Sequence, residues 1–74
     1  MRTLKFRIEE QGVTFIDSQT QQEQFMFFEE LSKPVILGGK PGIMLKDGRM
    51  AFVEYEEESE YTALIKAIFD NRGE

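Results

Sequence analysis

The last third of the chain has apolar residues at the spacing of one face of an α-helix. Ser59 can cap this helix at its start, and Asn71 and Gly73 can end it. A chain of 74 residues has room for one small core, in which the apolar face must be buried. The residues that follow the i, i+3, i+4, i+7, i+8 rule are Tyr61, Leu64, Ile65, Ile68 and Phe69.

The N-terminal residues alternate between apolar and polar side chains. Leu4, Phe6 and Ile8 are separated by polar residues, and the alternation resumes at Val13 and Phe15 after a glycine. A period of two is typical of a β-strand with one buried face. These residues therefore predict a β-hairpin.

Residues 43–55 predict a second hairpin. Its signal is Asp47-Gly48, since a type I′ turn needs positive φ at both central residues. A two-residue turn places Ile43 opposite Phe52, and Leu45 opposite Met50. A three-residue bulged turn would shift these pairs.

Residues 20–32 have the pattern of a second helix. Thr20 and Glu23 fit a capping box, the apolar residues that follow include Phe25, and Pro34 would end the segment. A strand over residues 24–28 is the alternative. With the helix, the order is ββαββα, and βαβ crossovers are expected. The sequence thus predicts one α+β domain over residues 1–74, with a four-stranded, mostly antiparallel sheet and two helices on one face.

The chain has no histidine and no cysteine. This removes the Ser-His-Asp and Cys-His catalytic systems and the usual zinc ligands. Ser59 has no base to activate it as a nucleophile, and Lys66 is expected on the polar, solvated side of its helix. We expect no enzymatic activity, no cofactor and no metal. The N-terminus does not have the pattern of a secretory signal, and no window is long and apolar enough for a membrane span, so a cytoplasmic location is expected.

Charge is arranged in blocks, and the formal net charge is −5. An acidic patch is expected in residues 54–60, where acids near a helix N-terminus favour its dipole. One alternative function is that of a nucleic-acid mimic, whose carboxylates would occupy the basic site of an enzyme that acts on DNA or RNA. Binding to a nucleic acid is itself disfavoured by the net charge. The acidic patch comprises Glu54, Glu56, Glu57, Glu58 and Glu60.

Residues 38–42 form a glycine-rich segment, Gly-Gly-Lys-Pro-Gly. Phosphate-binding loops lead into a helix, whose free N–H groups contact the anion, whereas this segment leads into a predicted strand. We interpret it as a surface connection; a loop that contacts a ligand or partner is the alternative.

Residues 51–55, Ala-Phe-Val-Glu-Tyr, resemble the second half of the third-strand signature of the RNA recognition motif family. The apolar register of the next helix is also similar to that family's. The resemblance implies single-stranded RNA stacking on Phe52. Other positions depart from the signature: Met50 takes an RNA-facing position, Arg49 replaces a glycine, and Thr14 stands where the family has a second aromatic residue. A divergent RNA binder of this type is a further alternative.

The second predicted hairpin is apolar on both faces, but helices cover only one face of the predicted sheet. The other face must then be exposed, self-associated or bound to another molecule. We therefore predict a small non-catalytic interaction or regulatory module, whose partner is another protein or a second copy. Its predicted contact residues are Ile43, Leu45, Met50 and Phe52, with Lys5 and Arg7 as a basic rim.

Overall fold

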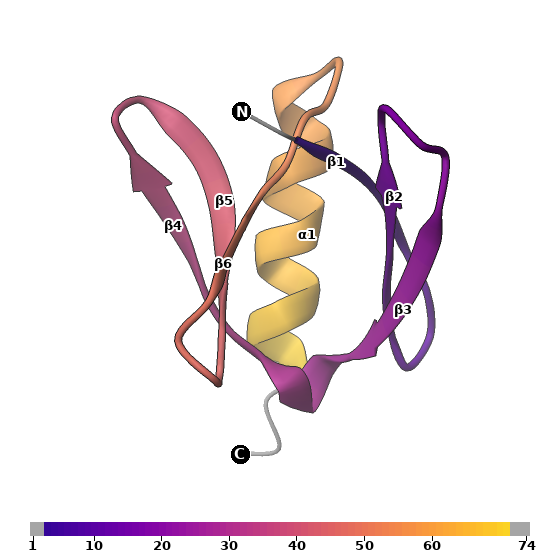
Figure 1. Cartoon of the computed structure of the whole chain (residues 1–74). Coiled ribbons are helices and arrows are strands. Elements are labelled where there is room, and N and C mark those ends of the chain that lie inside the picture. The colour runs from indigo at the N-terminus through magenta and orange to yellow at the C-terminus, as the bar shows by residue number, and fades with distance from the viewer. Residues whose placement is uncertain (1–2, 72–74) are drawn as a thin grey trace.

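The computed structural model describes residues 3–71, which form two three-stranded antiparallel sheets followed by one α-helix. Figure 1 shows the two sheets on either side of the helix. The first sheet has the order β1-β2-β3 and the second β4-β5-β6. The bounds are β1 Leu4–Ile8, β2 Gly12–Asp17, β3 Glu23–Phe27, the 3₁₀ turn η1 Phe28–Glu30, β4 Leu31–Leu37, β5 Lys40–Leu45, β6 Met50–Phe52 and α1 Glu58–Asp70.

The predicted N-terminal hairpin is confirmed as β1 and β2. Phe6 pairs with Phe15 and Ile8 with Val13, so these side chains share one face of the sheet; Val13 and Phe15 belong to the core and Phe6 packs against it, while Ile8 at the strand end is exposed. The third strand extends the sheet, with Met26 opposite Val13. Alternation therefore places every second residue of the three strands on the opposite, outer face.

The two sheets are joined at both ends. The turn η1 leads directly from β3 into β4, and the N–H of Glu54 donates to the carbonyl of Leu4 at 2.9 Å. Leu4 and Val53 also form an isolated parallel bridge. These links hold both inner faces against α1.

The C-terminal helix is confirmed, and its apolar face fills the space between the sheets. Tyr61, Leu64 and Ile68 are its buried residues. They pack in one cluster with residues from both sheets, among them Phe15 and Ile43. Each sheet therefore covers part of the helix, which neither sheet could bury alone.

The prediction of a ββαββα order with two helices on one four-stranded sheet is wrong. Residues 20–32 contain a turn, the strand β3, η1 and the first two residues of β4, and no α-helix. The hydroxyl of Thr20 accepts the N–H of Gln22 at 3.3 Å in a turn, rather than capping a helix. Gln21 has φ of 66°, outside the helical range. The predicted βαβ crossovers are absent from residues 3–71, where all strand pairs within the two sheets are antiparallel: β1·β2, β2·β3, β4·β5 and β5·β6.

Pro34 lies within β4 and does not end a helix. It pairs with Ile43 of β5 in a strand at the edge of its sheet. Proline is tolerated in edge strands because only one side of the strand must supply ladder hydrogen bonds. The segment after residue 30 therefore continues as sheet.

The second predicted hairpin is confirmed, but its turn has the three-residue bulged form. The N–H of Gly48 donates to Leu45 at 3.0 Å, and that of Leu45 to Arg49 at 2.8 Å. Gly48 alone adopts positive φ, 94°, in this turn. Asp47 accepts the Arg49 N–H and lies beside its guanidinium, which lowers the pKa of the Asp47 carboxyl.

The N-cap of α1 lies two residues before the predicted one. Glu57 is the N-cap, and Ser59 lies inside the first turn with its side chain exposed. The carboxylate of Glu60 accepts the Glu57 N–H at 3.2 Å, which satisfies a donor at the helix start. Asn71 is the C-cap as predicted, and Gly73 lies outside the described residues.

Candidate functional site

The outer face of the second sheet is apolar and flanked by lysines. Register alternation puts every second residue of β4 and β5 on this side, together with the ends of β6. No acidic residue occurs in the three strands. We call this surface the lysine-flanked face; it comprises Val35, Leu37, Met44, Met50 and Phe52, with Lys33 and Lys40.

Two side chains of β6 pack closely over Gly42 at the centre of this face. A Cβ at Gly42 would come 3.3 Å from Met50 Cε and 3.4 Å from the Phe52 ring. Phe52, Gly42 and Val35 occupy one row across the three strands. The two larger side chains are therefore half-buried against the sheet, while Leu37 at the edge is 58% exposed.

The predicted contact residues do not share one face. The bulged turn pairs Ile43 with Ala51, so that Ile43 and Leu45 point inward. They are 0% and 8% exposed and belong to the core. Met50 and Phe52 do lie on an outer face. The sequence could not assign the faces because a one-residue change in turn length reverses the side to which each strand residue points.

Lys5 and Arg7, the predicted basic rim, lie on the other sheet. Both are exposed on the outer face of β1, next to Ile16 and Thr14 of β2 respectively. Arg7 contacts the carboxylates of Glu9 at 3.5 Å and Glu23 at 3.7 Å. These contacts partly neutralise it, and the structure does not bring it to the lysine-flanked face.

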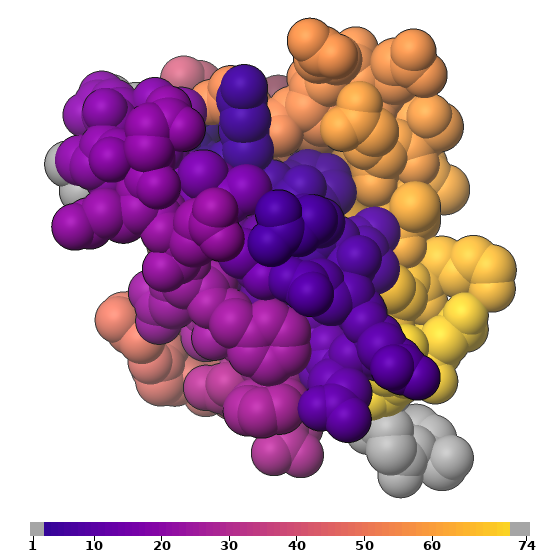
Figure 2. All heavy atoms as spheres, turned by 90° about the vertical axis from the view of Figure 1, so that its right-hand side faces the viewer, coloured from indigo at the N-terminus to yellow at the C-terminus, as the bar shows by residue number. Residues whose placement is uncertain are grey.

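A pair of phenylalanines stands on the outer face of the first sheet. Phe25 and Phe27 are 41% and 47% exposed, and their rings meet edge to face with centroids 5.0 Å apart. Figure 2 looks onto this side of the molecule. We call it the phenylalanine face; it comprises Phe25, Phe27, Arg7, Thr14, Glu9, Glu23 and Glu30.

Two polar side chains of the phenylalanine face form hydrogen bonds within it. Thr14 is buried although it lies on the outer side, and its hydroxyl donates to Glu9. Glu30 accepts the Phe27 N–H at 3.0 Å, which keeps a carboxylate beside that ring. The sequence favoured a helix here, and the alternative of a strand over residues 24–28 agrees with β3; neither prediction included the exposed pair Phe25 and Phe27, which alternate around the inward Met26.

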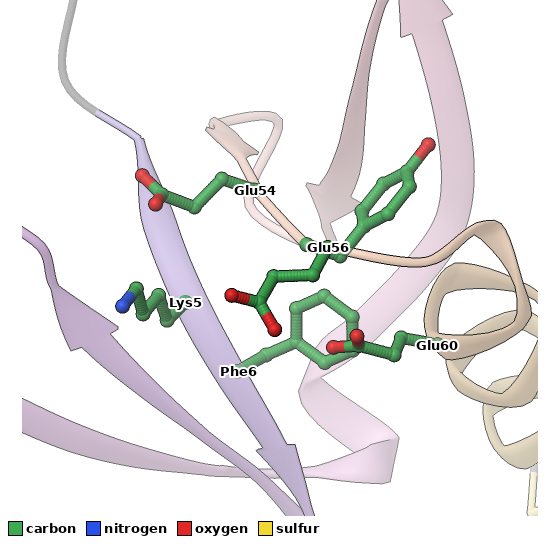
Figure 3. Close-up of a pocket in the computed structure, with 6 residues that line it drawn as sticks. Lys5, Phe6, Glu54, Glu56 and Glu60 are labelled. Carbon is green, nitrogen blue, oxygen red and sulfur yellow. The ribbon is translucent and has the colours of Figure 1, made fainter.

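Part of the acidic patch gathers around a hollow of about 300 Å³ at the start of β1. Glu54, Glu56 and Glu60 line it together with Phe6, and Figure 3 shows the Lys5 ammonium directed away from the Glu56 and Glu60 carboxylates. Thr3 donates to Glu54.

The other two members of the patch, Glu57 and Glu58, are exposed at the helix start. Within residues 3–71 no group of acidic, histidine or cysteine side chains is placed to hold a metal ion.

The glycine-rich segment forms a tight turn between β4 and β5. Gly38 and Gly39 have φ of 59° and 79°, and Leu37 pairs with Lys40 across them. Positive φ at both central residues is the requirement of a type I′ turn. Gly42 belongs to β5 itself. Turn geometry thus explains these glycines without a ligand.

The two sheets carry opposite net charge. Residues 3–30 have two basic and six acidic side chains, a net charge of −4, whereas residues 31–53 have four basic and one acidic, a net charge of +3. The helical part, residues 54–71, is again acidic. Positive charge is therefore concentrated on the second sheet.

Comparisons with protein-family models, with curated proteins and with solved structures find no match for this chain. In the described part of the chain, α1 is too short and too polar to cross a bilayer. The surfaces described above are thus the basis for any functional inference.

Proposed function

We propose that the chain is a small, non-catalytic protein-interaction module whose contact surface is the lysine-flanked face. The observation that carries this is the convergence of Val35, Leu37, Met44, Met50 and Phe52 on the side of the second sheet that α1 does not cover. An apolar sheet face that faces water in a small protein is typical of an interaction site.

The flanking charges indicate the chemistry of the partner. Lys33 and Lys40 border the apolar residues, and the strands offer no carboxylate to a basic partner. A partner with apolar side chains surrounded by carboxylates would therefore be favoured. Burial of a few hundred Å² at about 25 cal/mol per Å² would supply several kcal/mol before the cost of association.

Two alternatives predict different behaviour. A nucleic-acid mimic acting through Glu54, Glu56 and Glu60 would lose affinity for its target steeply as salt rises, because its contacts are ionic. A single-stranded RNA binder would depend on base stacking on Phe52, which is the only aromatic residue in β4, β5 and β6. An apolar contact with a lysine border keeps most of its affinity at high salt.

Capture experiments with matched variants test the proposal. Tagged wild-type protein, Leu37→Glu, Met50→Glu and Thr62→Glu would be incubated with lysate of the source organism, and retained proteins identified by mass spectrometry. Thr62 is exposed on α1, so its variant carries an added carboxylate away from the lysine-flanked face. We expect one partner to be retained by wild type and Thr62→Glu and lost from both face variants. A partner that binds all four proteins equally would refute the proposed surface.

A further inference from the structure

The two outer faces are complementary to each other, and we propose that a second copy of this chain is the partner, bound head to tail. In this arrangement the phenylalanine face of one copy docks on the lysine-flanked face of the next. The inference rests on the proposed function, because it names the occupant of the same lysine-flanked face.

The apolar parts of the two faces match in kind. Phe25 and Phe27 project from one sheet and are nearly half exposed. On the other sheet, Met50 and Phe52 pack over Gly42 and are half-buried, with Leu37 exposed at the edge. Aromatic and thioether side chains adapt to one another and contribute strongly to interface contacts.

The charges match in sign. Glu23 and Glu30 flank the phenylalanine pair, and Lys33 and Lys40 flank the opposing apolar residues. Counted over its own members, the phenylalanine face has three carboxylates, those of Glu9, Glu23 and Glu30, against the guanidinium of Arg7, a net charge of −2, whereas the lysine-flanked face has two ammonium groups and no carboxylate, a net charge of +2. Opposed charges at the rim favour this pairing over the pairing of either face with itself, which would bring like charges together.

The positions of the two faces determine the type of assembly. Figure 1 shows the sheets on either side of α1, so the outer faces point away from each other. Contact between two different faces is heterologous, and it leaves one free copy of each face at the ends of any short oligomer. Association should therefore continue beyond the dimer as concentration rises.

A complementation experiment tests this proposal directly. Phe27→Glu disables the phenylalanine face and Leu37→Glu disables the lysine-flanked face; both side chains are exposed, so neither change enters the core. Sedimentation velocity would be recorded for wild type, each variant, and their equimolar mixture. We expect wild type to grow past the dimer, each variant alone to associate about tenfold or more weakly, and the mixture to form a 1:1 dimer that does not grow.

Other outcomes would overturn the head-to-tail inference. These are a wild type that stays monomeric, a wild type that stops at a dimer, or a mixture of variants that stays monomeric. Thr62→Glu is the matched control and should behave as wild type. If either glutamate variant loses its native circular dichroism, Phe27→Ser and Leu37→Ser replace them. A monomeric wild type that still captures a foreign partner through Leu37 and Met50 would refute this inference and leave the proposed function standing.

Discussion

The hydroxyl of Tyr61 donates to the carbonyl of Gly42 at 2.9 Å and lies 3.2 Å from that of Val35. This contact joins α1 to the two strands that carry the centre of the lysine-flanked face. Gly42 is therefore held from the inner side by Tyr61 and covered on the outer side by Phe52. The helix and the proposed contact surface meet at one residue.

Removal of the Tyr61 hydroxyl should destabilise the protein. Tyr61→Phe keeps the ring in the core but leaves the two carbonyls without this donor, at a cost of about 1 kcal/mol in the free energy of unfolding. Urea denaturation measures the change. Tyr55→Phe is the control, because it also loses a hydroxyl while the Tyr61 hydrogen bonds remain. Equal stability of the two variants would contradict the assigned role.

Stability should also fall at alkaline pH through the same residue. Burial raises the pKa of the Tyr61 phenol above its ordinary value. The folded protein thus holds this proton more tightly than the unfolded chain, whose tyrosine pKa is about 10. The contribution is complete below that value and is lost as pH rises above it. The free energy of unfolding, measured from neutral pH to pH of about 11, should fall less steeply for Tyr61→Phe than for wild type. An equal fall in the two proteins would contradict this.

An added methyl group at Gly42 should perturb the lysine-flanked face from within. The Cβ of Gly42→Ala would lie 2.8 Å from the Ala51 carbonyl and press on Met50 and Phe52. We expect a loss of about 1–3 kcal/mol in the free energy of unfolding, as for other overpacked sites.

Thermal or urea unfolding would measure the Gly42→Ala effect. Thr62→Ala, on the exposed side of α1, is the control and should stay within about 0.5 kcal/mol of wild type. A Gly42→Ala protein as stable as that control would show that the close packing around Gly42 is wrong.

Sequence patterns identified the elements whose buried residues have a clear period. The first hairpin and α1 each bury one face, so alternation at Leu4, Phe6 and Ile8 and the helical spacing from Tyr61 to Ile68 were sufficient. The middle of the chain was misread because Gln, Glu and Met favour helices locally and Thr20 resembled a cap. In the folded protein, the pairing of β3 with β2 overrides that preference. Phe25 and Phe27 face water, so this strand does not have the usual alternation of buried apolar and exposed polar residues.

The candidate site was predicted in part. An apolar excess in residues 43–55 correctly indicated that this hairpin would be apolar on both sides, and Met50 and Phe52 do lie outside. Whether the turn has two or three residues decides which residues of β5 share a face with Met50 and Phe52, and the local sequence is compatible with both turn lengths. Val35 and Leu37 could not be assigned because their strand was itself not predicted.

An NMR dilution series is the measurement that tests the proposed contact surfaces most directly. Amide spectra of ¹⁵N-labelled wild-type protein would be recorded from high to low concentration. We expect shifts or line widths to change for Leu37, Met50 and Phe52 on one sheet and for Phe25 and Phe27 on the other, while Thr62 and Lys66 on the exposed side of α1 stay constant. Spectra that do not change with concentration, or changes confined to α1, would contradict association through the two outer faces.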